Sequence, residues 1–107
     1  MISIKKGEAK DIKFTYTSND TAIDVSANTF RFEVKKDISD TSPVFVKADG
    51  DFDKTDAADG IVYCNINTTD SNNPVGEYIA EIRMIATVGT DVDKSDNIDF
   101  IIEEAVM

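Results

Sequence analysis

Residues 74–84 of the chain read PVGEYIAEIRM, and this stretch is the strongest indication of the fold. It opens on the turn-forming residues Pro74 and Gly76 and then alternates between apolar and polar side chains. A period of two residues places successive side chains on opposite faces of a β-strand. The apolar face of the predicted strand carries Tyr78, Ala80, Ile82 and Met84, and the polar face carries Glu81 and Arg83.

The same alternation recurs in six other segments and predicts an all-β chain with about seven strands. Turn-rich segments at 18–20, 39–43, 49–51, 70–74 and 91–97 separate these strands. The best helix candidate, residues 53–59, is short and polar, so we expect less than a tenth of the chain to be helical. The apolar faces of the other strands are Ile2 and Ile4; Ile12, Phe14 and Tyr16; Phe30, Phe32 and Val34; Val44 and Val46; Val62, Cys64 and Ile66; and Ile98, Phe100 and Ile102.

The glycine and tyrosine at the start of the penultimate strand are typical of a tyrosine corner. Such a corner is a hallmark of immunoglobulin-like domains, which contain roughly 100 residues. We therefore predict one immunoglobulin-like domain over residues 1–107, built as a two-sheet antiparallel sandwich. Tyr78 should be buried, with its hydroxyl bonded to the backbone of residues 70–73, because a buried phenol needs a hydrogen-bond partner.

The composition excludes several classes of function. Histidine is absent, which removes the commonest general base and every histidine-ligated metal site. The single cysteine, Cys64, cannot form an intrachain disulfide, and its place between Val62 and Ile66 indicates a buried thiol. A net charge of −10 disfavours nucleic acid and anionic membranes as partners. The acidity favours solubility. The more specific alternative is that the chain binds a basic partner surface or a cation.

One acidic loop invites comparison with a metal site. Asp49, Asp51 and Asp53 occupy positions one, three and five, as at the start of an EF-hand calcium loop. Lys54 then stands where that loop needs glycine, and Gly60 stands where it needs glutamate. We interpret the segment as a solvated loop and expect calcium to bind weakly or not at all. A second acidic loop at 91–96 is a weaker candidate, and we predict no catalytic, cofactor-binding or metal-ligating residue.

Three aromatic residues, Phe45, Phe52 and Tyr63, fall outside the predicted core faces. They could form a sugar-binding platform, although scattered aromatics are more often packing residues. Phe45 lies in the segment 43–47, which we predict to be an edge strand for docking, with Phe45 as an exposed anchor. The alternative is that residues 49–59 cover Phe45. The opposite edge, the first strand, should be blunted by lysines at positions 5 and 6.

Taken together, the chain resembles the small immunoglobulin-like domains of tailed-phage and prophage baseplate or tail proteins, such as the N-terminal domain of the baseplate upper protein. The resemblance is carried by Ile4 to Glu8, Ala22 to Lys35, Gly60 to Val62, Asp70 to Tyr78, and Glu81 to Arg83, with Ile23-Asp24-Val25 followed by Phe30-Arg31-Phe32-Glu33-Val34 as its most distinctive part. It implies a non-enzymatic structural component without a cofactor that contacts other virion subunits or copies of itself.

The same resemblance implies a location in the virion, or in the bacterial cytoplasm before assembly. No apolar segment after Met1 has the character of a signal peptide, and no run is long enough to span a membrane. The alternative function is a ligand-binding module, such as a carbohydrate-binding or adhesin-type domain, assisted by a cation at Asp49, Asp51 and Asp53.

Overall fold

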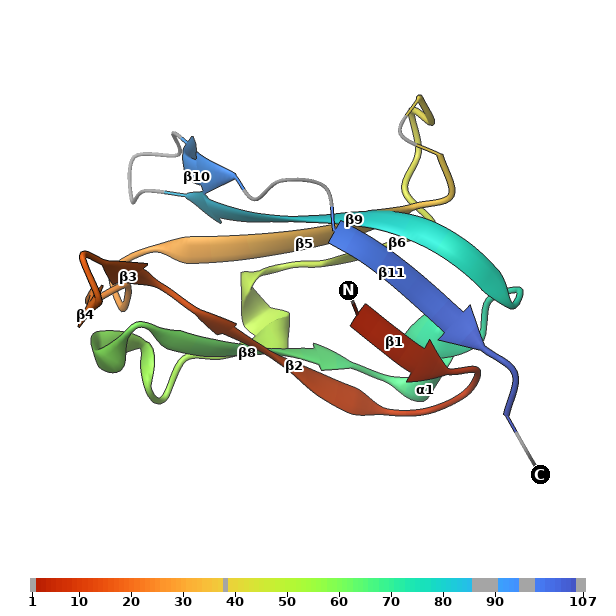
Figure 1. Cartoon of the computed structure of the whole chain (residues 1–107), viewed down its shortest axis with the longest axis horizontal. Helices are drawn as coiled ribbons and strands as arrows, with labels where there is room; N and C mark the ends of the chain where they lie inside the picture. The colour runs from red at the N-terminus through yellow and green to blue at the C-terminus, as the bar shows by residue number, and fades with distance from the viewer. Residues whose placement is uncertain (1, 38, 86–90, 95–97, 106–107) are drawn as a thin grey trace.

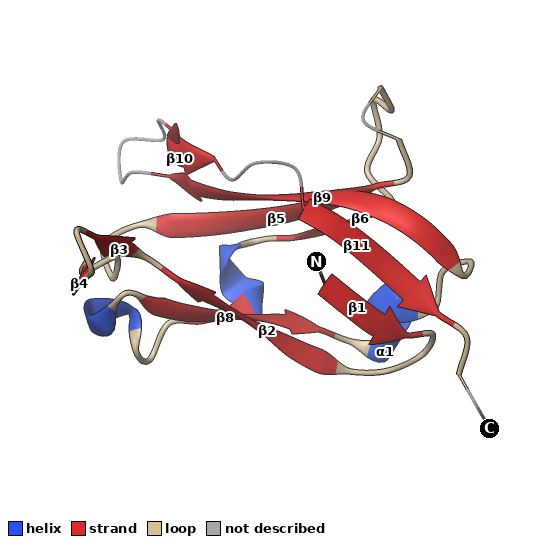
Figure 2. Ribbon diagram, in the orientation of Figure 1, coloured by secondary structure: helices blue, strands red, loops and turns tan. Residues whose placement is uncertain are grey.

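The computed structural model describes residues 2–37, 39–85, 91–94 and 98–105. Strands make up 53% of it and helices 11%, slightly more helix than the tenth expected from the sequence. Two sheets lie face to face, so the fold is an all-β antiparallel sandwich (Figures 1 and 2). Short helical turns lie in the connections between strands (Figure 2).

The larger sheet has the strand order β1-β11-β9-β5-β6, with β10 also paired to β9. The strand β1 runs parallel to β11, and the other neighbours in this sheet are antiparallel. The bounds are Ile2–Lys5 for β1, Thr29–Lys35 for β5, Phe45–Lys47 for β6, Gly76–Ile85 for β9, Asp91–Lys94 for β10 and Ile98–Glu103 for β11.

The smaller sheet has the order β2-β8-β7, with β2 at Lys10–Thr15, β7 at Phe52–Asp53 and β8 at Ile61–Ile66. A separate hairpin joins β3 (Thr17–Ser18) to β4 (Thr21–Ala22). Its loop residues Asn19 and Asp20 both have positive φ, at 51° and 64°, as a two-residue type I′ turn requires. The helical turns are η1 (Asp49–Asp51), η2 (Ala57–Asp59) and α1 (Thr68–Ser71).

The strand order resembles the immunoglobulin pattern. In that pattern strands B, E and D lie in one sheet, and strands C, F and G lie in the other. Here β2-β8-β7 occupy the places of B-E-D, and β5-β9-β11 occupy the places of C-F-G. The strand β6 adds a further edge beyond β5, and β1 adds one beyond β11.

One hydrophobic cluster fills the space between the sheets and contains most of the residues predicted to face inward, although Val46 is not part of it. The apolar residues predicted on β5, β8 and β9 are all buried, and Phe14, Tyr16 and Ile98 are partly buried against the same cluster. Aromatic rings link the layers: Phe14 and Phe32 lie 5.8 Å apart, and Phe30 and Phe52 lie 5.5 Å apart. Cys64 is fully buried, as predicted, and burial raises the pKa of its thiol to about 12.

The tyrosine corner forms at the start of β9. Tyr78 is 4% exposed, and its hydroxyl donates to the carbonyl of Pro74 at 2.5 Å. The prediction of a buried phenol bonded to upstream backbone is confirmed, but the acceptor is one residue beyond the expected range of 70–73. Burial also raises the pKa of the Tyr78 hydroxyl.

Two local predictions need correction. The expected turn at 91–97 contains the strand β10 at Asp91–Lys94, and residues 95–97 lie outside the described part. The expected turn at 70–74 partly belongs to α1, which Asn67 caps by accepting from the Asp70 amide at 2.8 Å.

Candidate interaction surface

The three aspartates of the acidic loop do not converge on a common point. The Asp49 carboxylate accepts from the Phe30 amide at 3.1 Å and pairs with the Lys54 ammonium at 3.0 Å. Asp51 caps η1 by accepting from the Ala48 amide. Asp53 accepts from the side chain and backbone of a threonine two residues later, and these bonds lower the pKa of its carboxyl. Asp51 and Asp53 therefore stabilise local turns, and Asp49 ties the loop to Phe30 on β5.

Across the described residues, no three acidic or cysteine side chains come together as ligands for a metal ion. Part of the weaker acidic loop at 91–96 is the strand β10, and the rest lies outside the described residues. None of the helices in the described part of the chain has the length and apolar character needed to span a bilayer.

The aromatic residues also differ from expectation. Phe52 is only 8% exposed and packs on Phe30, so it belongs to the core. Phe45 is half-buried and meets the ring of Phe100 edge-on at 5.9 Å between centroids. Tyr63 is half-buried on β8. The expectation that all three lie outside the core is wrong for Phe45 and Phe52, and these rings form no joint platform.

The strand β6 is an edge of the larger sheet, as predicted, but its two faces are reversed. Phe45 and Lys47 point inward, because Phe45 reaches Phe100 and Lys47 forms an ion pair with Asp70. The Lys47 ammonium lies 2.6 Å from the Asp70 carboxylate, and the two side chains are only 5% and 12% exposed. Phe45 is therefore not an exposed anchor, and its ring packs against Phe100 of β11.

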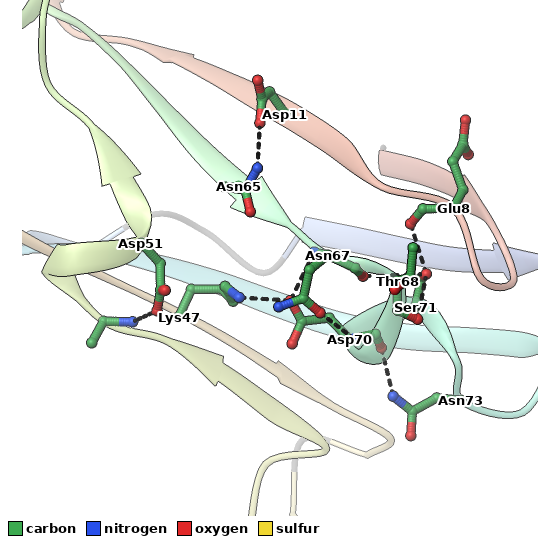
Figure 3. A network of polar contacts seen from close by, with 11 residues as sticks. Glu8, Asp11, Lys47, Asp51, Asn65, Asn67, Thr68, Asp70, Ser71 and Asn73 are labelled. Carbon is green, nitrogen blue, oxygen red and sulfur yellow. Dashed lines mark hydrogen bonds and ion pairs between the residues drawn. The ribbon is translucent and has the colours of Figure 1, made fainter.

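Figure 3 shows how this ion pair joins the edge strand to α1. Asp70 also accepts from the Asn67 amide at 3.0 Å, so one carboxylate both caps the helix and neutralises the lysine. Ser71, which is fully buried, donates to the carbonyl of Glu8 at 2.7 Å and ties α1 to the turn between β1 and β2. Alternation assigns a lysine to the solvent face by default. Lys47 is buried because the folded chain brings Asp70 next to it, and the alternation pattern does not show this.

The edge formed by β1 is protected by Lys10, which was not among the lysines predicted to protect it. The Lys10 ammonium, from β2, donates to the carbonyl of Ser3 on β1 at 2.9 Å. Lys5 lies 4.0 Å from the Glu103 carboxylate, and the Ser3 hydroxyl bonds to the same carboxylate. Charged groups therefore occupy this edge, as natural proteins arrange against unwanted strand pairing.

The outer face of the larger sheet carries a charge network in its centre. Arg31 lies directly opposite Arg83, and Glu33 lies directly opposite Glu81. Like charges at opposing positions destabilise a sheet. The side chains avoid this by pairing along and across the strands: Arg31 with Glu33 at 3.0 Å, Arg83 with Glu81 at 2.9 Å, and Arg83 with Glu33 at 3.3 Å. This part of the face is neutral and internally paired.

A hollow of about 410 Å³ lies beside this network, where β9 and β11 run together. We call it the Glu77–Asp99 hollow, and its lining residues are Lys36, Glu77, Tyr78, Ile79, Asp99 and Ile101. The register places Glu77 opposite Ile101 and Ile79 opposite Asp99. The two carboxylates thus occupy one diagonal of a four-residue square, and the two isoleucines occupy the other. The carboxylates are exposed, and the isoleucines are half-buried.

Lys36 closes one side of this hollow and is held in place. Its ammonium donates to the Glu77 carbonyl at 3.1 Å and lies 4.6 Å from the centroid of the Tyr78 ring. A cation over an aromatic face gains electrostatic stabilisation. The positive charge of Lys36 therefore lies beside a carbonyl and a ring, and among the described residues it forms no ion pair with Glu77 or Asp99.

The comparisons with known proteins agree with the fold. No protein-family model matches the chain, and no curated protein sequence is similar to it. Among solved structures, the chain is similar to the N-terminal domain of phage TP901-1 ORF48, with a TM-score of 0.67. The match covers 96% of this chain and 84% of the other, at 10% sequence identity. At that identity the likeness defines a shared β-sandwich fold.

Proposed function

We propose that this chain is a non-enzymatic structural domain of a phage or prophage tail or baseplate and that it acts by protein–protein contact. The observation that carries the proposal is the likeness in fold to a phage protein domain over nearly the whole chain. The sequence resemblance to baseplate and tail domains supports the same class. The partner is another virion subunit or a second copy of the chain, in the particle or in the bacterial cytoplasm before assembly.

We also propose that residues 1–107 act as one domain. A single cluster of buried side chains includes residues from both sheets, from Ile4 near the start to Ile102 near the end. A core shared by both sheets couples their stability, which is the behaviour of one folding unit.

The alternative function, a carbohydrate-binding or adhesin-type module, has less support. Phe45 and Phe52 pack inside the sandwich, so they offer no flat ring to a sugar. Asp49, Asp51 and Asp53 are each bonded to a different group, so they do not form a prepared cation site. The aromatic residues and aspartates that suggested this alternative therefore stabilise the folded domain.

The proposal is tested in the bacterial strain that carries the gene. Phage particles are induced, purified on a density gradient and analysed by quantitative mass spectrometry. We expect peptides of this chain to copurify with tail proteins at a constant ratio, and we expect tail, portal or lysis genes beside its gene. Particles that lack the chain, together with normal tails and infectivity after deletion of the gene, would overturn the proposal.

A further inference from the structure

The Glu77–Asp99 hollow differs chemically from the rest of the outer face. The charges in the neighbouring network are paired with one another, whereas the structure gives the carboxylates of Glu77 and Asp99 no hydrogen bond or ion pair among the described residues. Both side chains are exposed, and both border half-buried isoleucines. Unpaired carboxylates beside an apolar surface are complementary to a long basic side chain, which has an apolar stem and a cationic head.

The geometry favours arginine over lysine as that side chain. Diagonal neighbours on adjacent strands lie roughly 7–8 Å apart, which is the spacing of Glu77 and Asp99 in this register. A guanidinium has five donors in a planar fork and can face two carboxylates at once. An ammonium is a compact charge and would pair with one of them. The stem of an arginine would lie on Ile79 and Ile101.

The charge of the chain argues against a second copy as the main occupant. Two chains of net charge −10 repel each other, whereas a basic surface is attracted. Lys35 on β5 lies opposite Ile79 and therefore borders the hollow on the side away from Asp99. Its charge opposes the arrival of a cation, as does the charge of the lining residue Lys36, so both lysines lower the affinity of the site.

We propose that the Glu77–Asp99 hollow is a docking site for an arginine side chain of a different, basic virion protein. This inference rests on the proposed function, because it names the chemistry of the partner through which that function would be performed. The first residues of β9 and the middle of β11 form the site, and both strands are anchored by buried residues on their inner faces. The site therefore lies on two strands that contribute side chains to the hydrophobic core.

The first test measures binding of N-acetyl-arginine-amide to the isotope-labelled full chain by NMR. We expect amide shifts at 77–79 and 99–101 with millimolar affinity, and weaker shifts with N-acetyl-lysine-amide. The double variant Glu77→Gln and Asp99→Asn should bind about tenfold more weakly, because two exposed charge pairs are lost. The control variant Asp59→Asn and Glu104→Gln removes the same charge from exposed sites elsewhere and should bind as the wild type does.

One further variant tests the role of the neighbouring positive charge. Lys35→Gln should bind the arginine probe more tightly, since it removes a repelling charge. Equal binding of both probes, or equal binding by the double variant and the control variant, would overturn the proposal. A self-association that the double variant abolishes would assign the hollow to a second copy and would equally overturn it.

The second test measures how much of each variant is incorporated into phage particles. We expect the double variant to be recovered in purified particles at reduced occupancy and the control variant at wild-type occupancy. If the wild-type chain is in particles and the double variant enters them equally well, the docking site is wrong while the proposed function stands. If the wild-type chain is absent from particles, the proposed function is wrong whatever the probe binds. Thermal melts of all variants check that the fold is kept.

Discussion

Replacing Lys47 by methionine should destabilise the fold more than any other single change of charge in the described residues. The Lys47–Asp70 pair spans 2.6 Å, and its side chains are 5% and 12% exposed. Methionine keeps the apolar stem of lysine and removes the ammonium, so the substitution isolates the effect of the charge. Asp70 would then be a largely buried carboxylate whose remaining partner is the Asn67 amide at 3.0 Å.

The expected magnitude follows from the burial of the pair. Removing one partner of a buried ion pair costs about 3–5 kcal/mol because the other charge stays buried and unpaired. The remaining bond to Asn67 and the slight exposure of Asp70 place this case near the lower limit, at about 3 kcal/mol. A domain of this size has a total stability of about 5–15 kcal/mol, so the loss should be easily measured.

The assay is urea denaturation followed by circular dichroism, with Lys54→Met as the matched control. The Lys54–Asp49 pair has a similar distance, 3.0 Å, but its side chains are 28% and 36% exposed. Solvent-exposed pairs contribute about 0–1 kcal/mol, so the control should lose little. Adding Asp70→Asn to Lys47→Met should recover part of the loss by removing the stranded charge. Equal, small losses for Lys47→Met and Lys54→Met would show that burial does not make the Lys47–Asp70 pair more important than an exposed pair.

Four further predictions concern single features. Tyr78→Phe should lower the free energy of unfolding by about 1–2 kcal/mol in denaturant titration, because the Pro74 carbonyl loses its donor; an unchanged midpoint would count against the corner. Gly60→Ala should lower the melting temperature strongly, since a Cβ there would lie 2.4 Å from the Tyr16 carbonyl oxygen and φ is +78°, whereas Gly50→Ala meets nothing within 4 Å and should be tolerated. The buried Cys64 thiol, whose pKa is about 12 against an ordinary 9.0, should resist iodoacetamide at pH 8 unless urea is added; because the folded state holds this proton longer, the stability it contributes should be complete below pH 9 and decline from pH 9 to 12, and Cys64→Ala should show a smaller decline. Millimolar calcium should leave the melting temperature unchanged, and a rise of several degrees that Asp51→Ala abolishes would contradict the separate engagement of the loop carboxylates.

Most of the fold could be predicted because alternation determines which side of a strand meets the core. Phe30, Phe32 and Val34 are buried for that reason, and the same holds for Val62 and Ile66. Alternation predicts the wrong face where a polar residue finds a buried partner. Lys47 is inside because Asp70 neutralises it, and no local pattern reveals that two residues 23 positions apart will meet.

The missed helical turn α1 did have a local signal. Asn67 and Asp70 are spaced as a capping pair, in which each side chain bonds to the backbone amide of the other. The Glu77–Asp99 hollow had no such signal. It depends on the pairing of β9 with β11 and on the register that sets Glu77 diagonal to Asp99, and both are properties of the assembled sheet.

The parallel pairing of β1 with β11 determines how the molecule would respond to mechanical tension. Ile2 pairs with Phe100, and Lys5 pairs with Glu103, so the two strands run in the same direction. The start of β1 and the end of β11 therefore lie at opposite ends of the strand pair. A pull applied through the two ends of the chain would drag these neighbouring strands past each other along their length. The backbone bonds between them would then carry the load together in shear, and would not open one after another as in a zipper.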